Sequence, residues 1–210
     1  MEHDEAVARM QEIQRIMERT TLYTLLPGVP AIIGGIVALV GCGISYAMIG
    51  SVDFAQALSL PLLRQAQFLV MWAAVGGGAI ALDLAYTAAM ARRQGTSLVA
   101  RPGKLAALSL TPSVFVAGVI TLKLLLDGTE PAVQAIAPIW MMCYGTGVYA
   151  AGLFSLRLPR ILGIAFILAG AAGMFWLADY GLLLVAISFG CFHVVFGLLV
   201  VRRTRRSRDE

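Results

Sequence analysis

The chain has 210 residues, of which 59% are apolar and only 13% are charged, and its mean hydropathy is +0.82. Soluble globular domains average about 45–50% apolar and about 25% charged residues. The composition therefore excludes an ordinary soluble domain, a disordered chain and a nucleic-acid-binding module, and it predicts an integral membrane protein. The net charge of +4 bears on orientation in the bilayer rather than on a nucleic-acid partner.

The N-terminal segment 1–21 has the pattern of an amphipathic helix. Ala6, Met10, Ile13 and Met17 recur at spacings of four and three, which places them on one helical face. We expect this helix to lie on the membrane surface or against the protein body. Alternatively, it docks a cytoplasmic partner or a second copy of the chain. The first twenty residues are polar and contain no apolar core of a signal peptide, so we expect the first span to be a retained anchor.

Six apolar runs follow, and each is long enough to cross a bilayer, which takes roughly 17–25 residues. The segment 51–65 contains Asp53, Pro61 and Arg64 and is expected to be interfacial. The sequence predicts an all-α bundle of six transmembrane helices over 22–201, followed by a basic tail over 202–210. The expected spans are approximately 25–49, 68–91, 105–126, 134–154, 161–178 and 180–201. The short connection at residues 179–181 predicts that the last two spans form an antiparallel hairpin.

The basic residues lie almost entirely on one side of the predicted bundle. Fourteen of the 16 Lys and Arg residues fall before span one, between spans two and three, between spans four and five, or after span six. Cytoplasmic loops of membrane proteins carry an excess of Lys and Arg, so both termini are expected in the cytoplasm. Trp72, Trp140 and Trp176 fall at the opposite ends of the spans, where aromatic rings favour the membrane interface. We expect a multi-pass protein of a bacterial cytoplasmic membrane.

Small residues recur four apart inside several spans, as in helices that pack closely within lipid. The pairs Ala31 and Gly35, Ala74 and Gly78, and Ala169 and Gly173 are examples. Pro112 lies inside the third span and is expected to kink it, because proline leaves a backbone carbonyl without its helical partner.

Two ionisable residues fall at one depth in the middle of the bundle. Asp83 precedes Arg92 by nine residues, and His193 precedes Arg202 by nine residues. At 1.5 Å per residue, both lie about 13 Å above the basic border. Charged groups inside a bilayer are costly and mark functional sites. The same count from the basic border places Tyr149 and Pro112 at this depth, together with the neighbours of Pro112, Thr111 and Ser113. Three further polar residues lie within a few positions of it, Tyr86, Tyr144 and Ser188.

Two interpretations of this layer remain open. It is a structural polar clamp in which Asp83 and His193 pair, or it is a polar or proton-linked site. The second interpretation predicts a non-enzymatic protein that binds, senses or transports a small molecule or ion. The alternatives are an accessory subunit of a membrane complex and a membrane-embedded enzyme. No catalytic residue, metal site or cofactor is expected, with a haem or another tetrapyrrole pigment held through His193 as an alternative.

One resemblance to known proteins lies in the segment Ile16-Met17-Glu18-Arg19-Thr20, which runs into Leu25 and Gly28. It is similar to the opening of an uncharacterised group of bacterial six-span membrane proteins, in which a helix of the form I-R-x-M-M-E-R-S leads into a Gly/Ala-rich span. The resemblance covers about 25 residues. This chain departs from the group at Thr20-Thr21-Leu22-Tyr23. The resemblance implies the six-span topology and a bacterial source, and it implies no activity.

Overall fold

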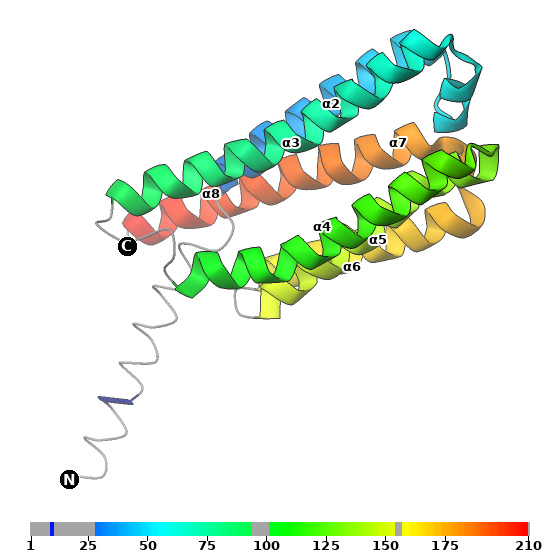
Figure 1. Ribbon diagram of the computed structural model, residues 1–210. Helices are drawn as coiled ribbons and strands as arrows, with labels where there is room; N and C mark the ends of the chain where they lie inside the picture. The colour runs from blue at the N-terminus through cyan, green and yellow to red at the C-terminus, as the bar shows by residue number, and fades with distance from the viewer. Residues whose placement is uncertain (1–8, 11–27, 94–100, 154–156, 210) are drawn as a thin grey trace.

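The structure, a computed structural model, describes residues 9–10, 28–93, 101–153 and 157–209. All regular secondary structure within these ranges is helical (Figure 1). Six helical segments are long and apolar enough to cross a membrane, which confirms the predicted all-helical class and the six spans. The predicted amphipathic helix over 1–21 lies outside the described residues, except for Arg9 and Met10, which are helical.

The helices extend further than the apolar runs that predicted them. The helix labelled α3 in Figure 1 begins at Leu62, so the last four residues of the expected interfacial segment 51–65 belong to a span. The first half contains a short 3-10 helix, and the basic tail continues the last helix. The elements are α2 (Gly28–Ile49), η1 (Phe54–Ser59), α3 (Leu62–Arg93), α4 (Arg101–Asp127), α5 (Glu130–Leu153), α6 (Arg157–Trp176), η2 (Ala178–Tyr180), α7 (Gly181–Val185), η3 (Ala186–Phe192) and α8 (His193–Asp209).

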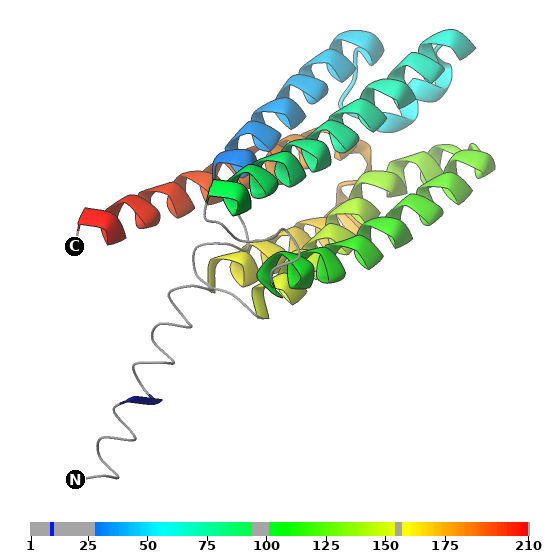
Figure 2. The same cartoon turned by 60° about the vertical axis from the view of Figure 1, so that its left-hand side comes forward.

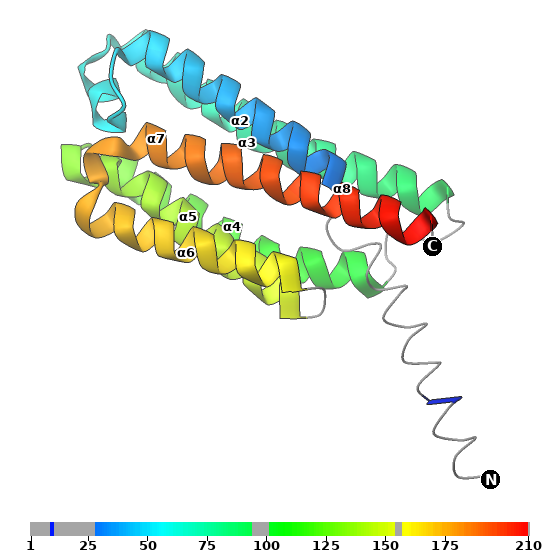
Figure 3. The ribbon, with the colours of Figure 1, turned by 180° about the vertical axis from the view of Figure 1, so that it is seen from behind.

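The sixth span is one composite helix, α7–η3–α8, and it lies between two helix groups. Views from opposite sides show it with α2 and α3 on one flank and α4, α5 and α6 on the other (Figures 1 and 3). After a rotation of 60° the pair α2/α3 still stands apart from α4 and α5 (Figure 2). The turn at η2 reverses the chain as predicted, but α6 packs mainly on α5, whereas α8 packs mainly on α2. The central helix therefore joins the two groups.

Glycines allow the closest helix contacts on both flanks of the molecule. A Cβ at Gly35 of α2 would lie 2.7 Å from the Gly190 carbonyl oxygen, and a Cβ at Gly145 of α5 would lie 2.7 Å from that of Gly163 in α6. Gly173 meets α5 and α7 in the same way, at Pro138 and Leu184. Backbones approach this closely only where side chains are absent, which is how helices associate within lipid.

The glycine run in α3 behaves differently. A Cβ at Gly76, Gly77 or Gly78 would meet no described atom within 4 Å, so the pair Ala74 and Gly78 supports no helix contact inside the described chain. Pro112 lies inside a continuous α4 and is exposed, while a second internal proline, Pro138 of α5, is fully buried. Proline at membrane depth is tolerated where neighbouring helices surround the freed backbone groups, as they do at Pro138.

The connection between α2 and α3 folds back over α5 and α7. The Asp53 side chain accepts a hydrogen bond from the Ala55 amide at 2.9 Å and so caps η1. The Leu182 amide donates to the Val52 carbonyl at 2.8 Å. Phe54 of η1 packs edge-on against Phe68 and Trp72 of α3. This end of the bundle, opposite the C-terminus, therefore has its own apolar core.

Candidate functional site

The candidate site is centred on His193, the first residue of α8. Its Nε2 lies 2.7 Å from the hydroxyl oxygen of Tyr144 in α5. The pair is a side-chain hydrogen bond between the central composite helix and the α4–α6 group. Lipid chains offer a polar group no hydrogen-bond partner, so a hydrogen bond between two helices satisfies both of the groups that form it. The imidazole therefore has one fixed partner, and that partner is a phenol from another span.

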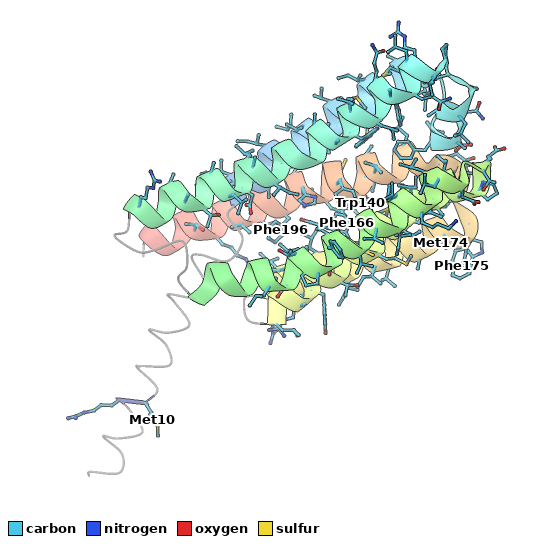
Figure 4. All side chains as sticks on the ribbon, in the orientation of Figure 1. Met10, Trp140, Phe166, Met174, Phe175 and Phe196 are labelled. Atoms are coloured by element: carbon cyan, nitrogen blue, oxygen red, sulfur yellow. The ribbon has the colours of Figure 1, made fainter. Side chains whose placement is uncertain are left out.

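Aromatic rings surround the imidazole on several sides. Phe189 stacks on it with an interplanar angle of 13° and ring centroids 6.0 Å apart, and Phe166 of α6 meets it edge-on at 5.4 Å. Tyr144 contacts both phenylalanines, at 5.0 Å and 5.2 Å between centroids. Figure 4 shows Phe166 and Phe196 in the interior between α8 and the α4–α6 group. Aromatic faces attract positive charge, so this enclosure favours a cation over an anion.

The helix that carries His193 is irregular immediately before it. Residues Ala186–Phe192 form a π-helix of seven residues, and His193 follows it directly. Single π-helical turns inside α-helices are rare and concentrate at functional sites. The buried Ser188 hydroxyl donates to the Leu184 carbonyl at 2.7 Å, which satisfies one backbone oxygen next to the irregular segment. The π-helix ends with the imidazole directed towards α5 and α6.

The second ring nitrogen of His193 has no partner. Nδ1 is buried, and no hydrogen bond of normal geometry joins it to any described residue. The Tyr144 hydroxyl can donate to Nε2 or accept from it, depending on which ring nitrogen carries the proton. A buried nitrogen without a partner is costly, and such groups mark strain, function or a missing ligand.

Asp83 lies on α3, across from this cluster. Its side chain is half-buried, and no hydrogen bond or ion pair to it is found among the described residues. No direct bond joins Asp83 to His193 within the described residues. The polar layer therefore consists of a bonded Tyr144–His193 pair and a carboxylate that stands apart from it.

The other residues assigned to the layer do not join the cluster. Thr111 and Pro112 are exposed on α4, and Tyr149 is exposed on α5. Ser113 faces α5, with its Oγ 3.1 Å from where a Cβ on Gly147 would be. Tyr86 is half-buried on α3. The sequence places all of these residues at one depth, but they lie on different faces of their helices and so do not meet.

Sequence reasoning places Tyr144 only near the predicted layer and does not identify it as the partner of His193. That pairing depends on which face α5 presents to α8. Phe166 and Phe189 have no sequence signal that separates them from other apolar residues of their spans. An aromatic residue within a few positions of an intramembrane histidine's depth was the only signal available in the sequence.

One polar cluster and two hydrogen-bonded side-chain pairs lie away from this site. Near the η1 end, the Gln134 amide donates to Asp53 and to Asp179, at 3.0 Å in each case. Trp72 and Trp140 donate to Ser45 and Thr121, at 3.0 Å and 2.8 Å. Within the described ranges, no three His, Cys, Asp or Glu side chains gather where a metal ion could bind.

The fold and the site define an all-helical protein with six apolar segments suited to a lipid bilayer and a histidine–tyrosine pair in its interior. The chain matches no protein-family model, no curated protein and no solved structure.

Proposed function

We propose that the protein binds a small molecule or ion at a mid-membrane polar site formed by His193, Tyr144 and Asp83, and that it transports or senses that ligand. The observation that carries the proposal is the position of His193. Its imidazole bonds to another helix through Nε2, and its buried Nδ1 has no hydrogen-bond partner among the described residues. Intramembrane ionisable residues are expensive and are retained mainly where they serve a ligand, an ion or a proton.

The surroundings favour a positively charged ligand or a proton. Three aromatic rings enclose the imidazole, and Asp83 on α3 is a carboxylate at the depth that the sequence predicts for His193. Both features lower the free energy of a nearby cation. A structural clamp would be expected to satisfy both nitrogens of the histidine and to pair the aspartate, and neither condition holds among the described residues.

The location that we propose is the cytoplasmic membrane of a bacterium, with both termini on the cytoplasmic side. Arg92, Arg157 and Arg202 are at the helix ends nearest the C-terminus, whereas Asp53, Asp127 and Asp179 are at the other end. The positive-inside rule supports this orientation. Reporter fusions to the C-terminus and to residue 128, one active only in the cytoplasm and one active only outside it, test the orientation.

The function is tested with the purified full-length protein in lipid nanodiscs. A panel of inorganic cations, amines and amino acids is screened by thermal shift, and each hit is then titrated against four variants. Asp83→Asn and His193→Gln should each weaken binding at least tenfold, or about 1.4 kcal/mol. Tyr144→Phe should weaken it less, because it removes only one hydrogen bond. Tyr149→Phe is the matched control, since Tyr149 lies at a similar depth on an exposed face. Hits that bind all four variants like the wild type would remove the support for this site.

A second candidate function, subunit of a membrane complex, is favoured by the open faces of α3 and α4. Only 6% of the span residues of each are buried inside the chain, against 44% for α5. The glycine run of α3 also meets no described atom, unlike the glycines of α5 and α6. Cross-linking of Ala74→Cys in native membranes tests this candidate. Adducts at Ala74 that are absent for the equally exposed Leu168→Cys of α6 would favour it.

A further inference from the structure

A cavity opens at the η1 end of the bundle, where α2 ends and α3 begins. Its volume of about 480 Å³ lies within the size range of small-molecule sites, roughly 300–1,000 Å³. It is open on one side, and its walls are apolar except for one arginine. The residues that line it are Ile44, Ala47, Met48, Leu60, Pro61 and Arg64.

Arg64 has no partner within the part of the chain that the structure describes. No hydrogen bond or ion pair to its guanidinium is found there, although Asp53 and Asp179 lie near the same end of the bundle. The neighbouring Gln65 amide is already bonded to the Leu58 and Leu60 carbonyls, at 3.0 Å and 2.8 Å. Gln65 thus helps to hold the connection in place, and no described residue pairs with the charge of Arg64.

The depth of the cavity matches the boundary between hydrocarbon and headgroups. The apolar span of α3 begins at Leu62, two residues before Arg64. Leu62 and Leu63 are 82% and 72% exposed, so the first turn of α3 presents apolar surface to lipid. A long basic side chain at such a position places its charge at headgroup level while its stem stays in the apolar layer.

We propose that this cavity binds one phospholipid molecule, with an acyl chain against Ile44 and Ala47 and the phosphate held by Arg64. A guanidinium offers two parallel N–H donors that fit two phosphate oxygens. The site has a single cation at the edge of an apolar cavity. A phospholipid has the matching arrangement, a charged headgroup followed by an apolar chain. This site is separate from His193 and does not depend on the function proposed for it.

The experiment measures phospholipid binding to delipidated full-length protein by native mass spectrometry. Phosphatidylglycerol, dioleoylglycerol and inorganic phosphate are titrated separately. The wild type should bind one phosphatidylglycerol tightly and bind the other two probes at least tenfold more weakly. Arg64→Gln should weaken phosphatidylglycerol binding by about tenfold or more, as expected for a lost hydrogen-bonded charge. Ala47→Leu, which fills the cavity without changing charge, should do the same.

Two further variants keep the result interpretable. Arg92→Gln removes an exposed arginine from the other end of α3 and should leave phosphatidylglycerol binding unchanged. Arg64→Lys keeps the charge without the paired donors and should give an intermediate affinity. The proposal is overturned if Arg64→Gln and Ala47→Leu bind like the wild type, or if dioleoylglycerol binds as tightly as phosphatidylglycerol. Binding of inorganic phosphate at the lipid's affinity would also overturn it, because the acyl chain would then contribute nothing.

Discussion

The Tyr144 hydroxyl and the Nε2 atom of His193, 49 residues apart in the chain, lie 2.7 Å from each other between α5 and α8. The contact joins the central composite helix to the α4–α6 group in the interior of the bundle. Both rings also pack against Phe166, so the polar contact is enclosed by apolar surface. Water cannot easily replace either partner there, and the hydrogen bond contributes to both the packing and the chemistry of the site.

Removing the phenol should destabilise the bundle. Tyr144→Phe leaves Nε2 of His193 buried without a partner, as Nδ1 already is. We expect the free energy of unfolding to fall by about 1–2 kcal/mol, the range for interhelical hydrogen bonds in lipid and for buried unsatisfied groups. Denaturant unfolding in nanodiscs measures the change. Tyr149→Phe removes an exposed hydroxyl from the same helix and should change stability little, so equal losses for the two variants would argue against a specific role of Tyr144.

The close contact between α5 and α6 should not tolerate a methyl group. A Cβ on Gly145 would lie 2.7 Å from the Gly163 carbonyl oxygen, so Gly145→Ala must push the two helices apart. Overpacking of this kind costs about 1–3 kcal/mol. Gly118→Ala in α4 is the matched control, because nothing described lies within 4 Å of its Cβ position. Thermal unfolding should show a loss for the first and no loss for the second, and a loss at Gly118 alone would contradict the packing described.

The fold followed from the sequence further than the site did. Long apolar runs and the positions of Arg and Lys predicted the six spans, because both are properties of single segments. The packing of η3 and α8 on α2 depends instead on Gly28 and Gly35 of α2 meeting Gly197 and Gly190, which are far from them in the chain and reach them only once the bundle forms. Local sequence contains no information on which glycine faces which helix.

The sequence predicts one depth for Asp83 and His193, but it does not indicate which side chains pair. Counting residues from Arg92 and Arg202 placed Asp83 and His193 at one level, since α-helices rise uniformly. Pairing also requires the rotation of each helix about its axis. The π-helix before His193 alters that rotation for α7 relative to α8, and nothing in the run from Ala186 to Phe192 marks such a turn. The partner that emerged was Tyr144 rather than Asp83.

Loss of the Gln134 side-chain amide should destabilise the connection over the η1 end. Gln134 donates to Asp53 and to Asp179, both at 3.0 Å, and so links the α2–α3 connection, α5 and η2. Gln134→Leu keeps the volume and leaves two nearby carboxylates without a common donor. We expect a loss of about 1–3 kcal/mol in the free energy of unfolding, measured by denaturant titration. Gln56→Leu, at an exposed position of η1, is the control and should cost less than about 0.5 kcal/mol.

The π-helix should tolerate the deletion of one residue, whereas a regular α-helix should not. Removing Ile187, which is exposed, lets Ala186–Phe192 become α-helical while α7 and α8 keep their present neighbours. The variant should fold with unfolding stability near that of the wild type, but it should bind ligands at His193 more weakly, because the ring no longer follows the π-turn. Removing Ile164, equally exposed but in the regular α6, rotates the rest of that helix by about 100° and should unfold the bundle. Helicity by circular dichroism and thermal unfolding compare the two. If both deletions destabilise the protein equally, the π-helix is part of the required packing rather than an inserted turn that serves the site.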